Sequence, residues 1–435
     1  MRLTNIAWNL GGLGGPLIVA ALTIPSLISM IGMERFGLLA LAWGLIGFAG
    51  IFDLGIGRAT TQIIARLRGS DQLAQVPAVL KTAVMLSFRT GLIGAILLAA
   101  AVLTGVHTHI KYATGLNVEV TNAAYLLALA IPIQSMSALF RGVNEAFENF
   151  REINLVRMGL GVANFLGPFC VAIFTTNLTV LVSTLLFSRL IAFFLFSKFA
   201  NACLTRQLPT EAQGVTVQAS SEIAKQLLSF GGWFTVSSFI SPVLLQADRF
   251  FIGTLISATA IATYTIPYEV VTQSLIIVGA ISSVAFPSLS SLVHSQPGKA
   301  ETMFRTWLFR VTVIMLVVTS LCALVLPLIL PWWIGPKLPA ESILIGQILC
   351  VGIFANSIGS MYFSLLHAYG RADVTAKLHL IELPLFLFAL YYLVTNIGVV
   401  GAAFAWAGRM VLDTFFLWSA HRMHLQMYVA NQGAK

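Results

Sequence analysis

The stretch VTVIMLVVTSLCALVLPLIL, residues 311–330, runs for 20 residues without a charged side chain. As a helix rising about 1.5 Å per residue, it is long enough to cross a hydrocarbon layer about 30 Å thick. The rest of the 435-residue chain has a similar character, because 58% of its residues are hydrophobic and only 9% are charged. An ordinary soluble domain carries about 25% charged residues. The sequence therefore predicts a polytopic helical membrane protein.

Apolar runs of similar length recur along the whole chain and predict twelve membrane-spanning helices. They are expected near residues 6–31, 37–57, 79–104, 122–144, 152–175, 178–200, 229–256, 260–286, 305–330, 341–368, 376–396 and 398–420. The longest break in hydrophobicity, residues 201–226, divides these spans six and six. We therefore expect an all-α fold of two six-helix bundles, residues 1–205 and 229–435, joined by a cytoplasmic linker at 206–228. Segment 58–77 is amphipathic and is expected to lie on the membrane surface.

The net charge of +9 is explained by the positions of the basic residues. Of the 25 Lys and Arg residues, eighteen fall in the even-numbered connections and the two termini. The odd-numbered connections hold only Arg35, Lys111 and Lys337, and four more arginines lie inside spans. This distribution follows the positive-inside rule and predicts that both termini are cytoplasmic. The basicity thus indicates membrane topology, and we expect no binding of nucleic acid.

Motifs for hydrolytic and nucleotide chemistry are missing from the sequence. There is no G-x-x-x-x-G-K-[ST] phosphate loop, so ATP hydrolysis by this chain is not expected. Ser, His and Asp do not fall into a nucleophile motif, and the four cysteines are widely separated with no His cluster at metal spacing. We therefore predict no catalytic residue, no metal site, no cofactor and no enzymatic activity.

Charged residues inside spans are the remaining candidates for function, because each costs at least about 2.5–3.5 kcal/mol unless it is paired or hydrated. In LLQADRFFIG, residues 244–253, Asp248 and Arg249 stand side by side. Counted from the turn near 258–259, Arg249 and Glu269 have the same depth, since antiparallel neighbours descend at the same rate. Arg249 can therefore pair with Glu269 or with Asp248.

A second network is predicted in the last two spans. The same count from the turn near 397–398 places Glu382 level with Asp413, while Arg409 lies one helical turn from Asp413. His379 is three residues before Glu382 on the same helix face. For both networks, a structural salt bridge that fixes helix packing is an alternative to a role in ion coupling.

Arg89 and Arg189 lie within spans of the first half and have no obvious acid at equal depth. We expect them to face a watery lumen together with Arg249 and Arg409. The alternative for Arg89 and Arg189 is that their long side chains reach the inner membrane surface.

Three segments carry a family resemblance. FDLGIGRAT, residues 52–60, contains Asp53 and Arg58, and QADRFFIG, residues 246–253, is followed by YTIPY at 264–268. In these segments the chain resembles bacterial Wzx-type oligosaccharide flippases, which belong to the multidrug/oligosaccharidyl-lipid/polysaccharide (MOP) exporter superfamily.

The resemblance implies a fold like that of the multidrug and toxin extrusion (MATE) transporters and a place in the bacterial inner membrane. It implies alternating-access transport of undecaprenyl-pyrophosphate-linked oligosaccharide for O-antigen, capsule or exopolysaccharide synthesis. Expected partners are membrane lipids, a polysaccharide polymerase and a chain-length regulator. Without an ATP site, energy is expected from a proton or sodium gradient or from periplasmic polymerisation.

Three alternatives stay open at this point. A cation antiporter of the same superfamily would use in-span acids, and here four such acids face four in-span arginines. A lipid II flippase is a second alternative. A membrane enzyme that polymerises or ligates sugars is a third. Enzymes of that kind resemble chains with a large periplasmic loop that carries the catalytic groups, and this sequence has no such loop.

Overall fold

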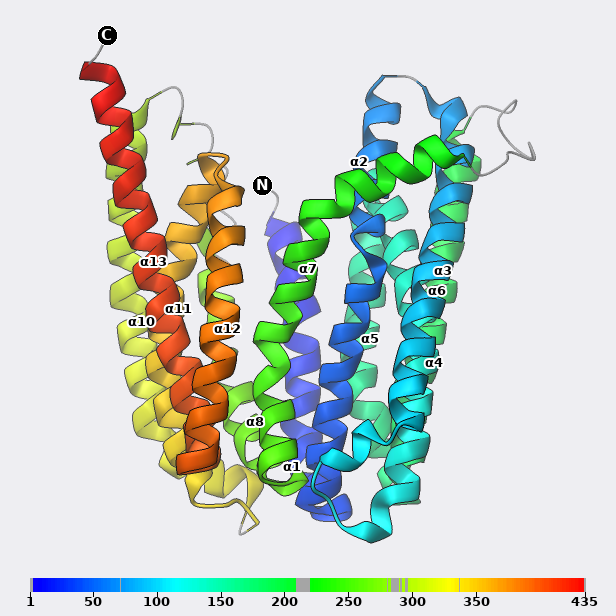
Figure 1. Ribbon diagram of the computed structural model, residues 1–435, viewed down its shortest axis with the longest axis vertical. Helices are drawn as coiled ribbons and strands as arrows, with labels where there is room; N and C mark the ends of the chain where they lie inside the picture. The colour runs from blue at the N-terminus through cyan, green and yellow to red at the C-terminus, as the bar shows by residue number, and fades with distance from the viewer. Residues whose placement is uncertain are drawn as a thin grey trace. The chain divides into compact units, whose positions relative to one another are not determined.

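The structure is a computed structural model, and it describes most of the chain. The described residues are 3–70, 72–208, 220–279, 281–282, 289, 292–293, 296–335 and 337–433. Within these ranges the regular structure is entirely helical, and long helices run the height of each part of the molecule (Figure 1). The predicted all-α class is confirmed.

The chain divides into two compact units, Met1–Val243 and Leu244–Lys435. The division falls inside α7, Ser221–Leu255, and so lies later in the chain than the predicted second bundle start at 229. Leu227 of α7, at the end of the predicted linker, is fully buried in the core of the first unit. Of the predicted linker 206–228, residues 209–219 lie outside the described residues.

The first unit contains the predicted first six spans. Its helices are α1 Leu3–Phe48, α2 Ile56–Gly69, α3 Val76–Leu103, α4 Asn117–Ala146, α5 Phe150–Ala172 and α6 Leu178–Gln207. Two predicted spans share α1, and Gly32 separates them with φ 80° and ψ 165°. This backbone conformation is essentially restricted to glycine. The second span ends earlier than predicted, at Phe48, and a short 3-10 helix, Ala49–Asp53, follows it.

In the second unit, the helices after α7 are α8 Ala258–Thr272, α10 Pro297–Ile334, α11 Glu341–Ala368, α12 Ala372–Ile397 and α13 Val399–Gly433. Helix α11 packs closely along α13. Gly352 makes this approach feasible, because a Cβ there would lie 2.6 Å from the Trp406 ring and 2.9 Å from the Ala407 backbone. The predicted spans at 341–368 and 376–396 correspond to α11 and α12.

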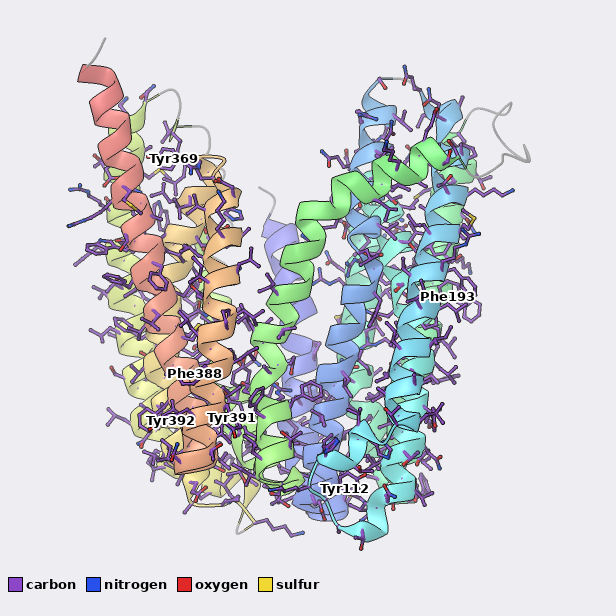
Figure 2. All side chains as sticks on the ribbon, in the orientation of Figure 1. Tyr112, Phe193, Tyr369, Phe388, Tyr391 and Tyr392 are labelled. Atoms are coloured by element: carbon purple, nitrogen blue, oxygen red, sulfur yellow. The ribbon has the colours of Figure 1, made fainter. Side chains whose placement is uncertain are left out.

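Ten helices in the described part of the chain are long and apolar enough to cross a membrane. Their outer surfaces are apolar, as at Phe309, Leu324 and Trp332 of α10, which are all more than two-thirds exposed. Phe388, Tyr391 and Tyr392 are exposed toward the end of α12 that leads into α13 (Figure 2). Aromatic side chains of this kind concentrate where a membrane meets water. The chain is a multi-pass membrane protein.

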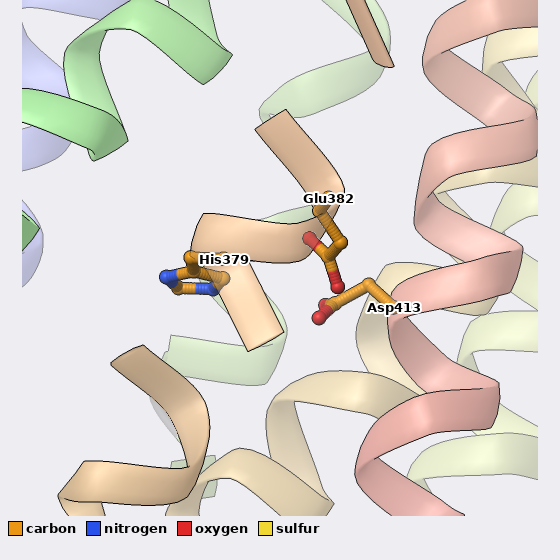
Figure 3. Close-up of side chains that lie close together, drawn as sticks. All are labelled: His379, Glu382 and Asp413. Atoms are coloured by element: carbon orange, nitrogen blue, oxygen red, sulfur yellow. The ribbon is translucent and has the colours of Figure 1, made fainter. Parts of the chain in front are cut away.

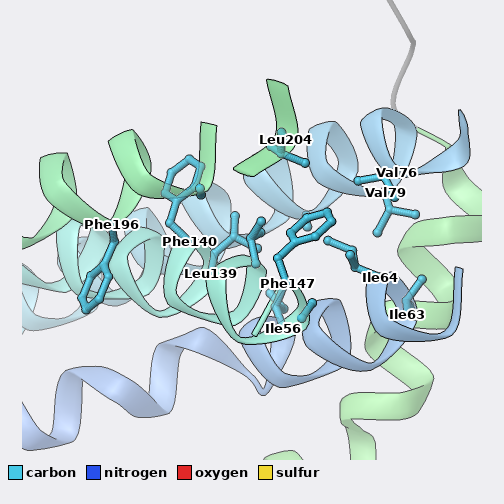
Figure 4. Packing of buried hydrophobic residues seen from close by; sticks show 14 of the residues in the cluster. Ile56, Ile63, Ile64, Val76, Val79, Leu139, Phe140, Phe147, Phe196 and Leu204 are labelled. Atoms are coloured by element: carbon cyan, nitrogen blue, oxygen red, sulfur yellow. The ribbon is translucent and has the colours of Figure 1, made fainter. Parts of the chain in front are cut away.

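Helix α2 lies within the segment predicted to rest on the membrane surface, but its apolar face is buried inside the protein. Ile56, Ile63 and Ile64 pack against Val79 and Leu139 of the neighbouring helices α3 and α4 (Figure 4). The amphipathic pattern predicted the helix correctly, but the apolar face of the helix packs on the protein core and not on the membrane surface. An apolar helix face is stabilised equally by a protein core or by lipid, and the pattern does not distinguish them.

Candidate functional site

Arg249 of α7 and Glu269 of α8 form an ion pair in the second unit, as the depth count predicted. Arg249 Nη2 donates a hydrogen bond to Glu269 Oε1 at 2.7 Å. The Arg249 guanidinium also lies over the Tyr268 ring, 5.4 Å from its centroid. Arg249 is 4% exposed, whereas the Glu269 side chain is 40% exposed. The pair therefore joins a buried cation to a carboxylate that remains accessible.

Asp248 lies on the other side of Arg249 and is fully buried. Its carboxylate accepts hydrogen bonds from the Tyr264 hydroxyl at 2.6 Å and from the Arg249 backbone N–H at 2.7 Å. The Tyr264 and Tyr268 rings stack at 5.6 Å. Tyr264 and Tyr268 belong to the YTIPY segment of the family resemblance. The structure places Tyr264 against Asp248 and Tyr268 against Arg249.

The predicted network of Glu382, Arg409 and Asp413 is also assembled, between α12 and α13. Figure 3 shows the carboxyl groups of Glu382 and Asp413 next to each other. Arg409 Nε lies 3.9 Å from Glu382 Oε2. Ligand atoms of His379, Glu382 and Asp413 all lie within 4.8 Å of one another, a separation that can hold a metal ion. The sequence predicted no metal site, because Asp413 follows Glu382 by 31 residues and no short motif joins it to His379 and Glu382.

Arg409 links this network to α7. Its Nη1 donates to the Leu244 carbonyl oxygen at 2.8 Å, and the guanidinium lies 5.2 Å from the Phe386 ring centroid. One turn earlier on α13, the Trp406 ring packs edge-to-face against the Tyr268 ring, with 5.6 Å between the ring centroids. The two networks predicted separately are therefore parts of one polar region in the second unit. A cavity of about 140 Å³ adjoins it, lined in part by Glu382, Phe386 and Arg409.

The two arginines of the first unit differ from those of the second. Arg189 of α6 is partly buried, and its Nη2 donates to the neutral Asn164 Oδ1 of α5 at 3.0 Å. Arg89 is exposed on α3, on a face shared with Leu92, Ile93 and other apolar residues. Among the described residues, neither arginine has an acidic partner. The sequence predicted this absence of acids and missed Asn164.

The motif residues Asp53 and Arg58 lie where the chain enters α2. Asp53 is buried, and its carboxylate oxygens accept the Gly57 backbone N–H at 3.2 and 3.3 Å. Burial raises the pKa of Asp53 to about 6, while the Gly57 hydrogen bond and the charges of Arg141 and Arg58 oppose this shift. Gly55 adopts φ 72°, a left-handed turn conformation. Arg58 is exposed. The hydrogen bonds of Asp53 and the turn at Gly55 give this motif a structural role at the start of α2.

A clamp of charged residues that the sequence analysis did not identify joins three helices of the first unit. Arg35 of α1 donates to both carboxylate oxygens of Glu119 at the start of α4, at 2.8 and 3.2 Å. Glu119 Oε2 also accepts the backbone N–H of Leu178, the first residue of α6, at 2.7 Å. An anion at a helix N-terminus is favoured by the helix dipole.

An apolar groove of about 900 Å³ runs between α5 and α6 of the first unit. Its walls include Gly159, Ala163 and Gly167 on α5 and Phe187 and Ile191 on α6. The groove lacks charged side chains, so it is not a site for the chemistry considered above.

Comparison with known proteins gives one family match over the first two-thirds of the chain and one relative over nearly its full length. A family model described as "Polysaccharide biosynthesis protein" matches residues 3–293. The chain is 30% identical over 423 residues to a Shigella flexneri protein named "Putative O-antigen transporter", covering 97% of this chain and 98% of that one.

Solved structures with a similar fold are transporters of the MOP superfamily. An inward-facing multidrug resistance MATE family transporter superposes with a TM-score of 0.79 at 17% identity, covering 96% of this chain and 98% of the other. A MOP superfamily transporter from Pyrococcus furiosus, whose description reports a binding pocket of reversed polarity, gives 0.68 at 16% identity over 95% and 93%. At these identities the likeness establishes the fold alone, and the predicted MATE-like fold is confirmed.

Proposed function

The chain belongs to the polysaccharide biosynthesis protein family, and from this membership we propose that it is a flippase for undecaprenyl-pyrophosphate-linked oligosaccharides. The observation that carries the proposal is the near full-length match to a protein named as an O-antigen transporter. In this proposal the protein lies in the bacterial inner membrane with both termini in the cytoplasm. It moves the sugar unit to the periplasmic leaflet by alternating access and has no catalytic activity.

The physical task explains why charged residues belong inside such a protein. A pyrophosphate and several sugars cannot cross hydrocarbon unaided, because each unsatisfied polar group costs several kcal/mol and each charge more. Arginine side chains on the path would offset the pyrophosphate charge, while the polyprenyl chain remains in lipid. The chain offers four in-span arginines for this purpose: Arg89, Arg189, Arg249 and Arg409.

The contacts of these arginines rank them as candidates for binding the pyrophosphate. Arg249 has an acid on either side, and Arg409 lies beside Glu382 with Asp413 one turn away, so their charges are already offset. Arg189 contacts a neutral amide, and Arg89 is exposed. We therefore propose Arg189 and Arg89 as the first contacts for the anion, with Arg249 and Arg409 as secondary candidates.

The acids of the second unit are proposed to couple transport to a proton or sodium gradient. Glu269 remains accessible beside Arg249, while Glu382 and Asp413 lie close together with His379. Removal of the product by a periplasmic polymerase, acting with a chain-length regulator, would also pull the reaction outward. These partners and the driving ion are expectations from the family.

The test is deletion of the gene in its own host in a strain that also lacks the polymerase. In that background a single repeat unit reaches the outer surface only if it is flipped. We expect deletion to abolish this single-unit product and to leave lipid-linked repeat units accumulating in the inner leaflet, with recovery on complementation. Unchanged single-unit product would contradict the proposal.

The same strains distinguish the alternatives. Restored efflux of an ethidium-like dye on complementation, without an effect on surface sugar, would indicate a cation antiporter. Arrested growth after depletion, with accumulated peptidoglycan precursor, would indicate a lipid II flippase. In a host that keeps its polymerase, loss of repeat-unit polymerisation on deletion of the gene, with flipping intact, would indicate an enzyme.

A further inference from the structure

In the second unit, the carboxyl groups of Glu382 on α12 and Asp413 on α13 lie next to each other, with the ring of His379 to one side (Figure 3). One ligand atom from each of the three residues lies within 4.8 Å of the others. We propose that these three residues form a binding site for a divalent transition-metal cation of the Zn²⁺ class. These are residues proposed above for ion coupling, and the site gives them a specific ligand. It rests on the geometry of α12 and α13 and does not depend on the flippase activity.

The donor set selects the class of cation. One imidazole nitrogen and two carboxylates suit zinc and its transition-metal neighbours, which bind nitrogen and oxygen together. Magnesium and calcium take oxygen ligands and keep ordered water or carbonyl partners, so a histidine in the set disfavours them. Two carboxylates and a neutral imidazole supply two negative charges, of which the Arg409 guanidinium, 3.9 Å from Glu382, offsets one, so the cluster keeps a net negative charge for a cation.

The distances require little movement. Zinc bonds to nitrogen and oxygen are about 2.0–2.2 Å long, so two ligand atoms of one ion lie at most about 4.2 Å apart. The three ligand atoms here are within 4.8 Å of one another. Small rotations about side-chain bonds close this difference without moving either helix.

The surroundings of Glu382 independently favour a bound cation at this point. It is only 3% exposed, and neither of its carboxylate oxygens accepts a hydrogen bond from any residue that the structure describes. Asp413 Oδ1, which is also buried, lacks such a donor as well. Buried polar groups without partners are rare and costly in proteins. A metal ion held between them would satisfy both carboxylates together.

Arg409 does not already fulfil this role. Its Nε stands 3.9 Å from Glu382 Oε2, beyond hydrogen-bonding distance. The guanidinium is held elsewhere, by the Leu244 carbonyl oxygen at 2.8 Å and by the Phe386 ring. Arg409 can therefore stay in place, and the two carboxylates keep their lone pairs for an ion.

A cavity lies beside one of the three ligands. Its volume of about 140 Å³ exceeds the about 30 Å³ that a water molecule takes in the liquid, but of the three ligands only Glu382 lines it, and its other walls are mostly apolar. Three protein ligands and one to three waters make up the usual coordination of such an ion. A bound cation would cross-link α12 to α13, because its ligands come from both helices.

The test is a titration of the purified full-length protein, freed of any polyhistidine tag, with ZnCl₂ in competition with a chromophoric chelator. We expect one equivalent of Zn²⁺ per chain with micromolar or tighter affinity, and no displacement by millimolar Mg²⁺, Ca²⁺ or Na⁺. His379→Ala and the near-isosteric Asp413→Asn should each weaken binding at least ten-fold. The exposed His109 lies far along the chain from this cluster, and His109→Ala should bind as the wild type does.

A second readout guards against variants that fail to fold. Each variant is first checked by gel filtration, and Zn²⁺ should then raise the thermal midpoint of the wild type and of His109→Ala only. Co²⁺ should give a visible absorption band that His379→Ala alters. The proposal is overturned if no saturable binding occurs, if binding survives in both His379→Ala and Asp413→Asn, or if Na⁺ competes at equal concentration. None of these outcomes bears on whether the protein moves lipid-linked sugars.

Discussion

Arg249 and Glu269, twenty residues apart in the sequence, meet at 2.7 Å, and the two side chains stand in very different surroundings. The arginine is buried and the glutamate is 40% exposed. Loss of Arg249 would therefore leave Glu269 at a partly exposed position rather than in the core. Arg249, in contrast, balances a second carboxylate, that of Asp248, which has no access to solvent. The stability of the contact between α7 and α8 therefore depends more on Arg249 than on Glu269.

The first prediction concerns the stability of this group. Arg249→Met leaves the buried Asp248 without its adjacent cation and should lower the free energy of unfolding by about 3–5 kcal/mol. Glu269→Gln keeps a hydrogen-bond acceptor for Arg249 on a half-exposed side chain and should cost no more than about 1 kcal/mol. Thermal unfolding of the detergent-purified variants, followed by light scattering, gives the comparison. A larger loss in Glu269→Gln would contradict this assignment.

The reciprocal exchange gives a sharper form of the same test. Arg249→Glu combined with Glu269→Arg preserves the pair but brings a second carboxylate beside Asp248. We therefore expect the double variant to remain unstable. Adding Asp248→Asn removes that repulsion and should recover part of the lost thermal midpoint. Full recovery in the double variant alone would show that Asp248 carries no weight in the group.

The sequence predicted the Arg249–Glu269 pair because a short turn joins the two helices. Helix α7 ends at Leu255 and α8 begins at Ala258, so counting residues from that turn gives both depths. No such count reaches the contact between Arg409 and the Leu244 carbonyl, 165 residues apart. That contact depends on how non-adjacent helices pack, and a single sequence contains no measure of it.

The second prediction concerns Arg189 and surface polysaccharide. Arg189→Gln should abolish the polysaccharide while membrane protein levels stay near those of the wild type, because its partner Asn164 is neutral and no buried acid is left behind. Arg157→Gln, at an exposed position of the adjacent α5, is the matched control and should leave the polysaccharide unchanged. Gel analysis of surface sugar and immunoblots of membranes provide the two measurements. Normal polysaccharide in Arg189→Gln would remove this residue from the transport path.

Asn164 was missed because only acids were considered as partners for in-span arginines. The turn between α5 and α6 is short, running from Ile173 to Asn177, so the same depth count applies to this helix pair. From the centre of this turn, Asn164 lies 11 residues back and Arg189 lies 14 forward, a difference in depth of about 4.5 Å that a long arginine side chain can span. A search that included amides and allowed for this reach would have found the contact. The contact between Arg35 and Glu119 was beyond such reasoning, because 84 residues and two further helices lie between them.

The third prediction concerns that clamp. Glu119→Gln loses the charge that holds Arg35 and weakens the contact with the first turn of α6, and we expect a loss of about 1–3 kcal/mol in unfolding free energy. Glu145→Gln is the control, since Glu145 pairs with Arg141 of the same helix at 3.5 Å and these two side chains are 36% and 41% exposed. Exposed pairs of this type contribute about 0.3–0.5 kcal/mol. Similar thermal midpoints for the two variants would mean that Glu119 does not join the helices.

The fourth prediction tests the close approach of α2 to α4, which positions the Asp53 motif. A Cβ at Gly142 would overlap the Gly57 carbonyl oxygen, and a Cβ at Gly57 would lie 2.9 Å from that of Ala138. Backbone atoms cannot move aside as a side chain can, so Gly142→Ala should cost about 1–3 kcal/mol. Gly159→Ala on α5 is the matched control, because no atom lies within 4 Å of the added methyl group. The gain in helix propensity, up to about 1 kcal/mol, predicts an unchanged or slightly raised thermal midpoint for Gly159→Ala.

Two outcomes decide what this helix contact does. Loss of surface polysaccharide in Gly142→Ala, without loss in Gly159→Ala, would tie the contact to transport. Equal thermal midpoints for the two variants would contradict the close packing of α2 on α4.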